Sequence, residues 1–448
     1  MVVLLILTHS CKKFVGIPPS PQLIQTAAVF ANNQTAISAV DGVYTAIRAG
    51  QPSFENGALS IYNGLTSDEL MNNTPNPTYD PFYQNAIPSN NSTIAGTFWL
   101  TPFNTLYRAN AILAGVTESK TLTDSIKRQL TGEMKVIRAL TYFYFTNLYG
   151  DVPLLLTPDY KQNAVAARTP STQIYAQIIA DLKDAENLLT DNYPSTGKAR
   201  PNKETAAALL ARVYLYEKDW PDAELQASQV INSGMYSLST DLNSVFTINS
   251  TETIWEIASP GEAKSTAEAA AFIPGSASIK PSFSVTASLL NAFESGDLRK
   301  SNWINSTVVS NVTYYYPFKY QNRSNTNITE YEVVIRLAEL YLIRAEARAM
   351  QANIAAATID INTIRSRAGL PSLSNLTLAQ SITAIMQERR IELFAEWGNR
   401  WFDLKRTGNI DEVLGAVKSD WQSFDALFPI PYSQILYNIN LKQNPGYN

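Results

Sequence analysis

The chain has 448 residues, a formal net charge of −4, one cysteine and one histidine. A balance this close to neutral offers no basic field for DNA or RNA, so we expect no nucleic-acid partner. No internal apolar run reaches the roughly 18 residues that a membrane-spanning helix needs. The length suits one large unit with a sizeable core, which we place over residues 26–448.

The N-terminus is a short apolar run that ends in a small residue, Ser10, followed by the only cysteine, Cys11. This pattern is typical of a lipoprotein signal, in which cleavage before the cysteine frees its thiol and amine for acyl chains that hold the protein on a membrane. The run lacks a preceding Lys or Arg and has Thr8 where leucine is usual. We expect residues 1–10 to be the signal peptide and residues 11–25 a lipidated tether. The alternative is a free thiol on a cytosolic protein.

Cleavage before Cys11 would also remove His9, the only histidine of the chain. A mature chain without imidazole and without a free thiol could not build Ser-His-Asp or Cys-His catalysis, or zinc sites that use histidine or thiolate. Only carboxylate, lysine, tyrosine or Ser-Lys chemistry would remain to an enzyme. The adjacent carboxylates Asp68 and Glu69 could coordinate a hard cation, but such pairs more often lie at the N-terminus of a helix. We therefore predict no metal site and no cofactor.

Helical periodicity dominates the chain and predicts a mostly α-helical fold. The predicted helices span residues 26–49, 99–113, 126–149, 172–189, 202–216, 222–232, 333–350 and 354–368. The last four form two pairs, each joined by a short turn and each of about the length of a tetratricopeptide unit. We expect helical pairs near residues 126–233 and 333–368 to build a tetratricopeptide-like superhelical scaffold.

Two stretches, residues 50–97 and 234–330, break this periodicity and are rich in Asn, Ser, Thr and aromatic residues. We predict long loops there, with short strands near residues 253–258 and 313–320. The second stretch would form an irregular insertion that projects from the helical scaffold. Aromatic rings on polar loops suit carbohydrate, because a sugar presents an apolar C–H face to the ring while its hydroxyls bond polar side chains. The candidate ligand residues are Tyr79, Phe82, Tyr83, Trp303, Tyr314, Tyr315 and Arg323.

Among these candidates, Trp303 lies between Asn302 and Asn305, and we expect it to be exposed. The alternative interpretation is that each ring packs its own loop onto the helices, which is common for aromatic side chains. Trp99, which has apolar partners one and two helical turns further on, is expected in the core.

The C-terminal block, residues 377–447, contains the densest charge of the chain, with nine charged residues between Gln387 and Arg406. Apolar residues at helical spacing place Arg389 inside the buried stripe of a helix that we expect to end near Gly398, and an unpaired guanidinium would be costly there. Bridges between arginines and carboxylates are the simplest solution. We therefore predict a structural ion network of Glu388, Arg389, Glu392, Glu396, Arg400, Asp403 and Arg406.

The run from Glu388 to Arg406 resembles the C-terminal signature of the SusD/RagB family, E-R-R-x-E-L-x-x-E-G-x-R-W-x-D-L-x-R. It differs from that signature by Trp397, an additional aromatic residue before the glycine. Further blocks that agree with the family are residues 331–347, 428–431 and 443–447. The resemblance spans nearly the whole chain and implies a single SusD-like domain with its ligand loops in the two stretches of irregular sequence.

This resemblance implies an outer-membrane lipoprotein, facing the cell exterior, that captures an oligosaccharide and hands it to a SusC-like TonB-dependent transporter. Binding needs no catalytic residue, so we expect no enzyme activity. Three alternatives stay open: a peptide-binding member of the same family, a carboxylate glycosidase, and an interaction scaffold whose helix pairs hold peptides. The glycosidase would use Glu392 and Glu396, but the interleaved arginines should lower the pKa of these carboxylates, whereas a general acid needs a raised pKa.

Overall fold

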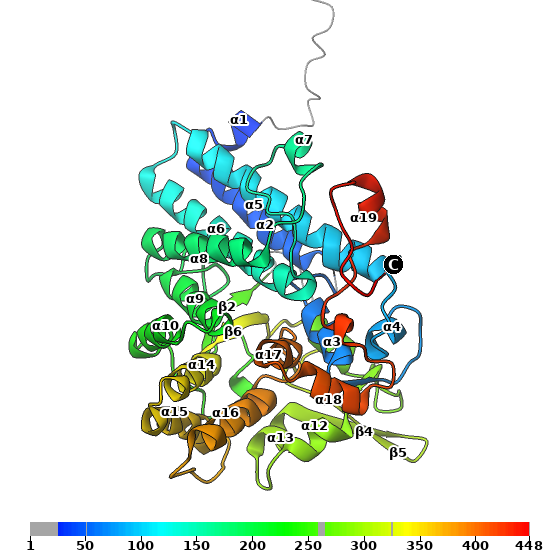
Figure 1. The fold of residues 1–448 in the computed structure, drawn as a ribbon. Coiled ribbons are helices and arrows are strands. Elements are labelled where there is room, and N and C mark those ends of the chain that lie inside the picture. Colours follow the sequence, from blue (N-terminus) through cyan, green and yellow to red (C-terminus); the bar gives the residue numbers. More distant parts are fainter. Residues whose placement is uncertain (1–25, 51, 259–264, 324–325, 448) are drawn as a thin grey trace, which may run out of the picture.

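The computed structural model describes residues 26–50, 52–258, 265–323 and 326–447 (Figure 1). The predicted signal peptide, Cys11 and the tether lie outside the described residues. The fold is mostly α-helical, as the periodicity predicts, and its described part contains three short two-stranded sheets. None of the described helices is long and apolar enough to cross a membrane.

Three of the long helices in the first half of the chain are α2 (Asn33–Arg48), α5 (Thr101–Glu118) and α6 (Asp124–Tyr149). The other helices of this half are α1 (Thr26–Val29), α3 (Ala58–Thr66), α4 (Asp80–Tyr83), the π-helix η1 (Ile94–Leu100), α7 (Tyr160–Asn163), α8 (Ser171–Leu188), α9 (Lys203–Glu217) and α10 (Trp220–Asn232). Helix α6 ends at Gly150, whose φ of 72° is easily reached by glycine. The helix predicted over residues 26–49 is divided into α1 and α2.

Helices α9 and α10 pack against each other as the first predicted pair, and α14 (Leu337–Met350) and α15 (Ile354–Arg367) form the second. The two pairs stack because α10 contacts α14 (Figure 1). Asn202 caps α9, since its side chain accepts a hydrogen bond from the backbone N–H of Thr205 at 2.9 Å. This arrangement confirms the predicted superhelical scaffold.

The three antiparallel sheets tie the irregular stretches to the helices. Strand β1 (Leu70–Asn72) pairs with β3 (Phe283–Val285), β2 (Thr253–Ile257) pairs with β6 (Glu332–Arg336), and β4 (Ile304–Val309) forms a hairpin with β5 (Val312–Pro317). Between them lie η2 (Leu242–Ser244), α11 (Ala267–Phe272), α12 (Ala287–Ala292) and α13 (Leu298–Trp303). Strands β2 and β5 lie where the sequence predicts strands. Because β1 pairs with β3, the two irregular stretches meet in one surface.

Residues 50–97 are more regular than the sequence suggests. Helix α3 lies in the middle of this stretch and every one of its residues is buried. A helix that is buried on all sides has no polar face, so its sequence shows no period of 3.6 residues. The prediction of a continuous loop is therefore wrong for residues 58–66.

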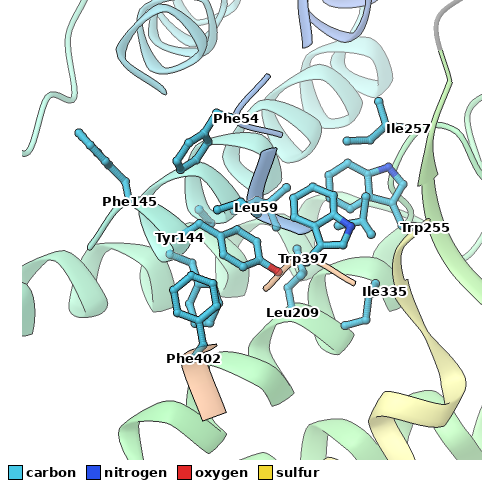
Figure 2. Close-up of a cluster of buried hydrophobic side chains, with 14 of the residues drawn as sticks. Phe54, Leu59, Tyr144, Phe145, Leu209, Trp255, Ile257, Ile335, Trp397 and Phe402 are labelled. Atoms are coloured by element: carbon cyan, nitrogen blue, oxygen red, sulfur yellow. The ribbon is translucent and has the colours of Figure 1, made fainter. Parts of the chain in front are cut away.

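Aromatic side chains from distant parts of the chain meet in one core (Figure 2). The ring of Tyr144 on α6 stacks on Trp397 with centroids 5.2 Å apart, and Phe402 lies 5.6 Å from the Tyr144 ring. Trp397 Nε1 donates to the carbonyl of Val333 at 2.8 Å. The core thus joins α6, β6 and the C-terminal block.

The C-terminal block forms α16 (Leu378–Glu392), α17 (Asn399–Thr407), α18 (Ile410–Val417), η3 (Ser423–Ala426) and α19 (Tyr432–Tyr437). Helix α16 ends at Glu392, so the predicted end near Gly398 is wrong. Ala395, Trp397 and Gly398 take positive φ angles of 52°, 50° and 70°. A Cβ atom at Gly398 would come within 2.5 Å of Asn63 Nδ2, so this turn requires glycine.

Candidate functional site

The predicted ion network is centred on the guanidinium of Arg336 on β6. Its Nη1 donates to Glu392 at 2.6 Å and to Glu252 at 2.7 Å, and its Nε donates to Glu396 at 2.9 Å. Arg367 donates to two of the same carboxylates, Glu252 at 2.5 Å and Glu392. None of these five side chains is more than 7% exposed. These charges therefore have to be neutralised by one another, because water cannot reach them to solvate them.

Further ion pairs extend the network along the C-terminal block. They are Arg389–Asp403 (2.8 Å), Arg406–Asp403 (2.7 Å), Arg400–Asp68 (2.7 Å), Arg299–Glu388 (2.9 Å) and Arg299–Glu392 (3.1 Å). All seven residues of the predicted network thus take part in ion pairs. Asp68 does not begin a helix, because it follows α3, and it serves instead as a counter-ion for Arg400.

The arginines determine the protonation of the two glutamates that the glycosidase hypothesis would use. Burial alone would raise the pKa of Glu392, but Arg367, Arg336 and Arg299 hold that pKa well below its usual range. Burial acts in the same direction on Glu396, whose pKa is nevertheless lowered by Arg336 and by Lys319. A general acid must keep its proton near neutral pH, so this environment is unsuited to that role.

Trp303 is not exposed, contrary to the prediction. Its side chain is 0% exposed, its Nε1 donates to the carbonyl of Leu242 at 2.9 Å, and Lys319 Nζ lies 4.7 Å from its ring centroid. The polar neighbours misled the prediction, because Asn305 is exposed on β4 whereas the indole at the end of α13 turns inward. A sugar cannot stack on this ring while the protein is folded.

The aromatic residues of the first irregular stretch differ in exposure. Phe82 is fully buried among other core rings, so it is also excluded as a surface platform. Tyr79 and Tyr83 are half-buried. The ring of Tyr79 meets Phe283 of β3 edge-on at 4.9 Å, and Lys418 Nζ lies 4.2 Å from the centroid of Tyr83. Tyr79 therefore lies at the junction between the two irregular stretches.

The β4–β5 hairpin separates the two adjacent tyrosines, because successive residues of a strand point to opposite faces. Tyr314 is paired with Thr307, whose Oγ1 donates to the carbonyl of Ala277 at 2.6 Å, so this face of the hairpin lies against the body. Tyr315 is paired with Ser306 on the opposite face and is 42% exposed. The two rings do not form one platform.

The face that carries Tyr314 gathers polar donors around a half-buried ring. Lys280 Nζ lies 6.0 Å from the Tyr314 centroid. Arg323 and Ile279 flank Gly275, where an added Cβ would lie 3.7 Å from an atom of each. We call the inner hairpin face the surface formed by Asn73, Tyr79, Ile279, Lys280, Tyr314 and Arg323.

Asn73 connects this face to the first irregular stretch. Its Nδ2 donates to the carbonyl of Pro281 at 3.1 Å, and its Oδ1 accepts from Ser284 Oγ at 3.2 Å. Segment 275–283 thus lies next to Arg323, Tyr314 and Tyr79 in turn, whereas Tyr315 is on the other side of the hairpin. Lys280 was not predicted, because it lies in a Ser-rich stretch without a recognisable motif.

Two family models match the chain. The one described as SusD family matches residues 291–447, and the one described as starch-binding associating with outer membrane matches residues 33–215. The inner hairpin face takes Tyr314 and Arg323 from the first match and Asn73 and Tyr79 from the second.

SusD-like protein P2 of Formosa agariphila is 30% identical over 369 residues, which cover 69% of this chain and 72% of that protein. The crystal structure of a SusD superfamily protein from Bacteroides vulgatus superposes with a TM-score of 0.81 at 21% identity, covering 93% of this chain and 100% of the other. The structure of a laminarin-binding SusD-like protein gives 0.80 at 26% identity, again over 93% and 100% of the two chains. The similarity in fold therefore extends over nearly all of both chains.

Proposed function

The chain belongs to the SusD family, and from this premise we propose that it is a surface lipoprotein of the outer membrane that binds an oligosaccharide. It then delivers the sugar to a SusC-like TonB-dependent transporter. The family is a carbohydrate-binding one, and the model over residues 33–215 is described as associating with the outer membrane. In this proposal Cys11 carries the lipid and residues 26–448 form the single binding domain.

The inner hairpin face is the observation that supports binding of a sugar. The ring of Tyr314 offers an apolar surface for the C–H face of a pyranose, while Lys280 and Arg323 supply donors for its hydroxyls. The Thr307–Ala277 hydrogen bond holds the hairpin to the body, so less conformational entropy is lost when a sugar binds. Laminarin, the ligand of the structural relative at 26% identity, is the first oligosaccharide to test.

We propose that the sugar leaves this protein unaltered. The carboxylates of Glu392 and Glu396 are buried and paired with arginines, which supports a structural role for them. The mature chain would also lack histidine and a free thiol, since His9 precedes the cleavage site and Cys11 is acylated.

Isothermal titration calorimetry of residues 12–448 with laminarin oligosaccharides, guided by a glycan array, tests this proposal. Tyr314→Ala should weaken binding about fivefold, because the stacking of one aromatic ring is worth roughly 1 kcal/mol. Tyr315→Ala removes the same side chain from the opposite face and should leave the affinity unchanged. The reverse pattern would place the site on the outer face. Cleaved products would contradict a pure binding role, and an array without any hit would favour the peptide-binding alternative.

The location and the partner need a separate experiment. In a bacterial host that processes lipoproteins, the full chain should incorporate labelled palmitate and sediment with outer membranes, whereas Cys11→Ser should be released from them. A TonB-dependent transporter should co-purify with the wild-type chain. Unlabelled protein in the cytosol, or complexes that contain no transporter, would contradict this part of the proposal.

A further inference from the structure

A concave surface lies between the start of α5, helix α7 and helix α19, away from the inner hairpin face. Figure 1 shows α7 and α19 at the end of the molecule opposite the β4–β5 hairpin. The cavity has a volume of about 430 Å³, within the range of small-ligand sites. Its lining includes the side chains of Asn104, Tyr107, Tyr160, Gln434 and Tyr437.

Three tyrosine rings from three different helices border this cavity. Tyr107 on α5 is 54% exposed, Tyr160 on α7 is 72% exposed and Tyr437 on α19 is 85% exposed. A group of exposed rings around one hollow is typical of an interaction surface, whereas single exposed apolar residues are ordinary. The three rings therefore expose apolar surface on which a ligand could pack.

The polar groups of the cavity are equally available. The amides of Asn104 and Gln434 make no hydrogen bond with any residue in the described part of the chain, and the same holds for the three tyrosine hydroxyls. Of the described residues that line the cavity, none is charged. A ligand with hydroxyl groups and no net charge matches this combination of rings and neutral amides.

The walls of the cavity are held in place from behind. Beneath it, Trp99 is buried and meets Phe103 edge-on with centroids 5.4 Å apart. Asn438, at the end of α19, donates to the carbonyl of Ala166 at 2.8 Å, and Asn440 donates to that of Val165 at 2.7 Å. These bonds join the segment after α19 to the segment after α7, so the two helices that carry Tyr160 and Tyr437 are fixed relative to each other before a ligand arrives.

We propose that this cavity is a second carbohydrate site, which binds a neutral pyranose unit independently of the inner hairpin face. The competing occupant is a protein partner, since Leu436 and Ile439 extend the apolar surface beyond the cavity. The concave shape and the unpaired amides favour the sugar, because a flat apolar contact would not need them. The inference shares only the class of ligand with the proposed function.

Saturation-transfer NMR and calorimetry on residues 12–448, with laminarin oligosaccharides and the glycans that bind on an array, test this second site. In the Tyr314→Ala background, sugar binding should persist, and adding Tyr437→Ala or Tyr160→Ala should weaken the remaining binding at least tenfold. Tyr432→Ala is the matched control, because Tyr432 lies on α19 outside the cavity lining and is also exposed.

The outcomes separate the two proposals. If Tyr314→Ala alone abolishes all sugar binding, the second site is wrong while the proposed function stands. If Tyr437→Ala lowers affinity and Tyr314→Ala does not, the cavity is the main site and the assignment of the inner hairpin face fails. If Tyr437→Ala leaves every sugar affinity unchanged but reduces co-purification of the transporter, the cavity is a protein-docking surface and the inference is overturned.

Discussion

Glu392→Gln tests whether the buried ion network stabilises the fold. Glu392 lies where Arg336, Arg367 and Arg299 meet, and its side chain is fully buried. The amide would leave buried guanidinium charge without its counter-charge, which typically costs about 3–5 kcal/mol. An unfolding entropy of about 2.1 cal/mol/K per residue gives about 0.9 kcal/mol/K for 448 residues. We therefore expect the unfolding midpoint to fall by roughly 3–5 °C.

Differential scanning calorimetry at several pH values measures this effect. The pKa of Glu392 is depressed in the folded state, so its contribution is fully present above the unfolded pKa of about 4.3 and is lost as the pH falls towards the folded pKa. The difference between wild type and variant should thus be constant from about pH 8 to 5 and shrink below that. Glu294→Gln is the control, because Glu294 pairs with Arg365 but is 43% exposed and should cost less than about 1 kcal/mol. Equal midpoints for the two variants would refute the reasoning.

Three further predictions follow from buried residues. Burial raises the pKa of Glu55 to about 7, so wild-type stability should decrease as the pH rises from about 4.5 to 7, and Glu55→Gln should remove roughly 3 kcal/mol of this decrease in urea unfolding. A pH dependence that the variant retains would contradict this assignment. Trp303→Ala should cost about 3–5 kcal/mol of stability and leave the laminarin affinity of the folded protein unchanged; a selective loss of affinity would show that the ring contacts the ligand. Gly398→Ala should cost more than about 1 kcal/mol in the same assay, because its φ is positive and the added Cβ would meet Asn63; wild-type stability would show that the turn can relax.

The parts of the fold that sequence reasoning predicts are those in which one face of a helix meets solvent. The pair α9 and α10 shows this, because polar residues on the outer side of α10 leave a clear period. Helix α3 has no solvent-exposed side, so its sequence shows no such period and the helix is not predicted. Arg389 could be placed in an ion pair from sequence, since a buried guanidinium has few alternatives, and Asp403 now supplies that partner.

The candidate site was harder to predict because ring direction depends on strand register. Tyr314 and Tyr315 are neighbours in a predicted strand and so point to opposite faces, but only the pairing of β4 with β5 and the Thr307–Ala277 hydrogen bond show that Tyr314 is the one that faces the body. Trp303 and Lys280 illustrate the same limit. The first has polar neighbours but points inward, and the second carries no motif but is brought to Tyr314 by the folded chain.

The partnership of Asp68 with Arg390 and Arg400 has a consequence for the order in which the protein can mature. The partners are separated by 322 and 332 positions along the chain, so the ribosome makes the acid long before either base. Until the last quarter of the polypeptide has emerged, closing the N-terminal half would trap a carboxylate without compensation. The surroundings of Asp68 should therefore reach their final packing only after Arg390 and Arg400 have been made.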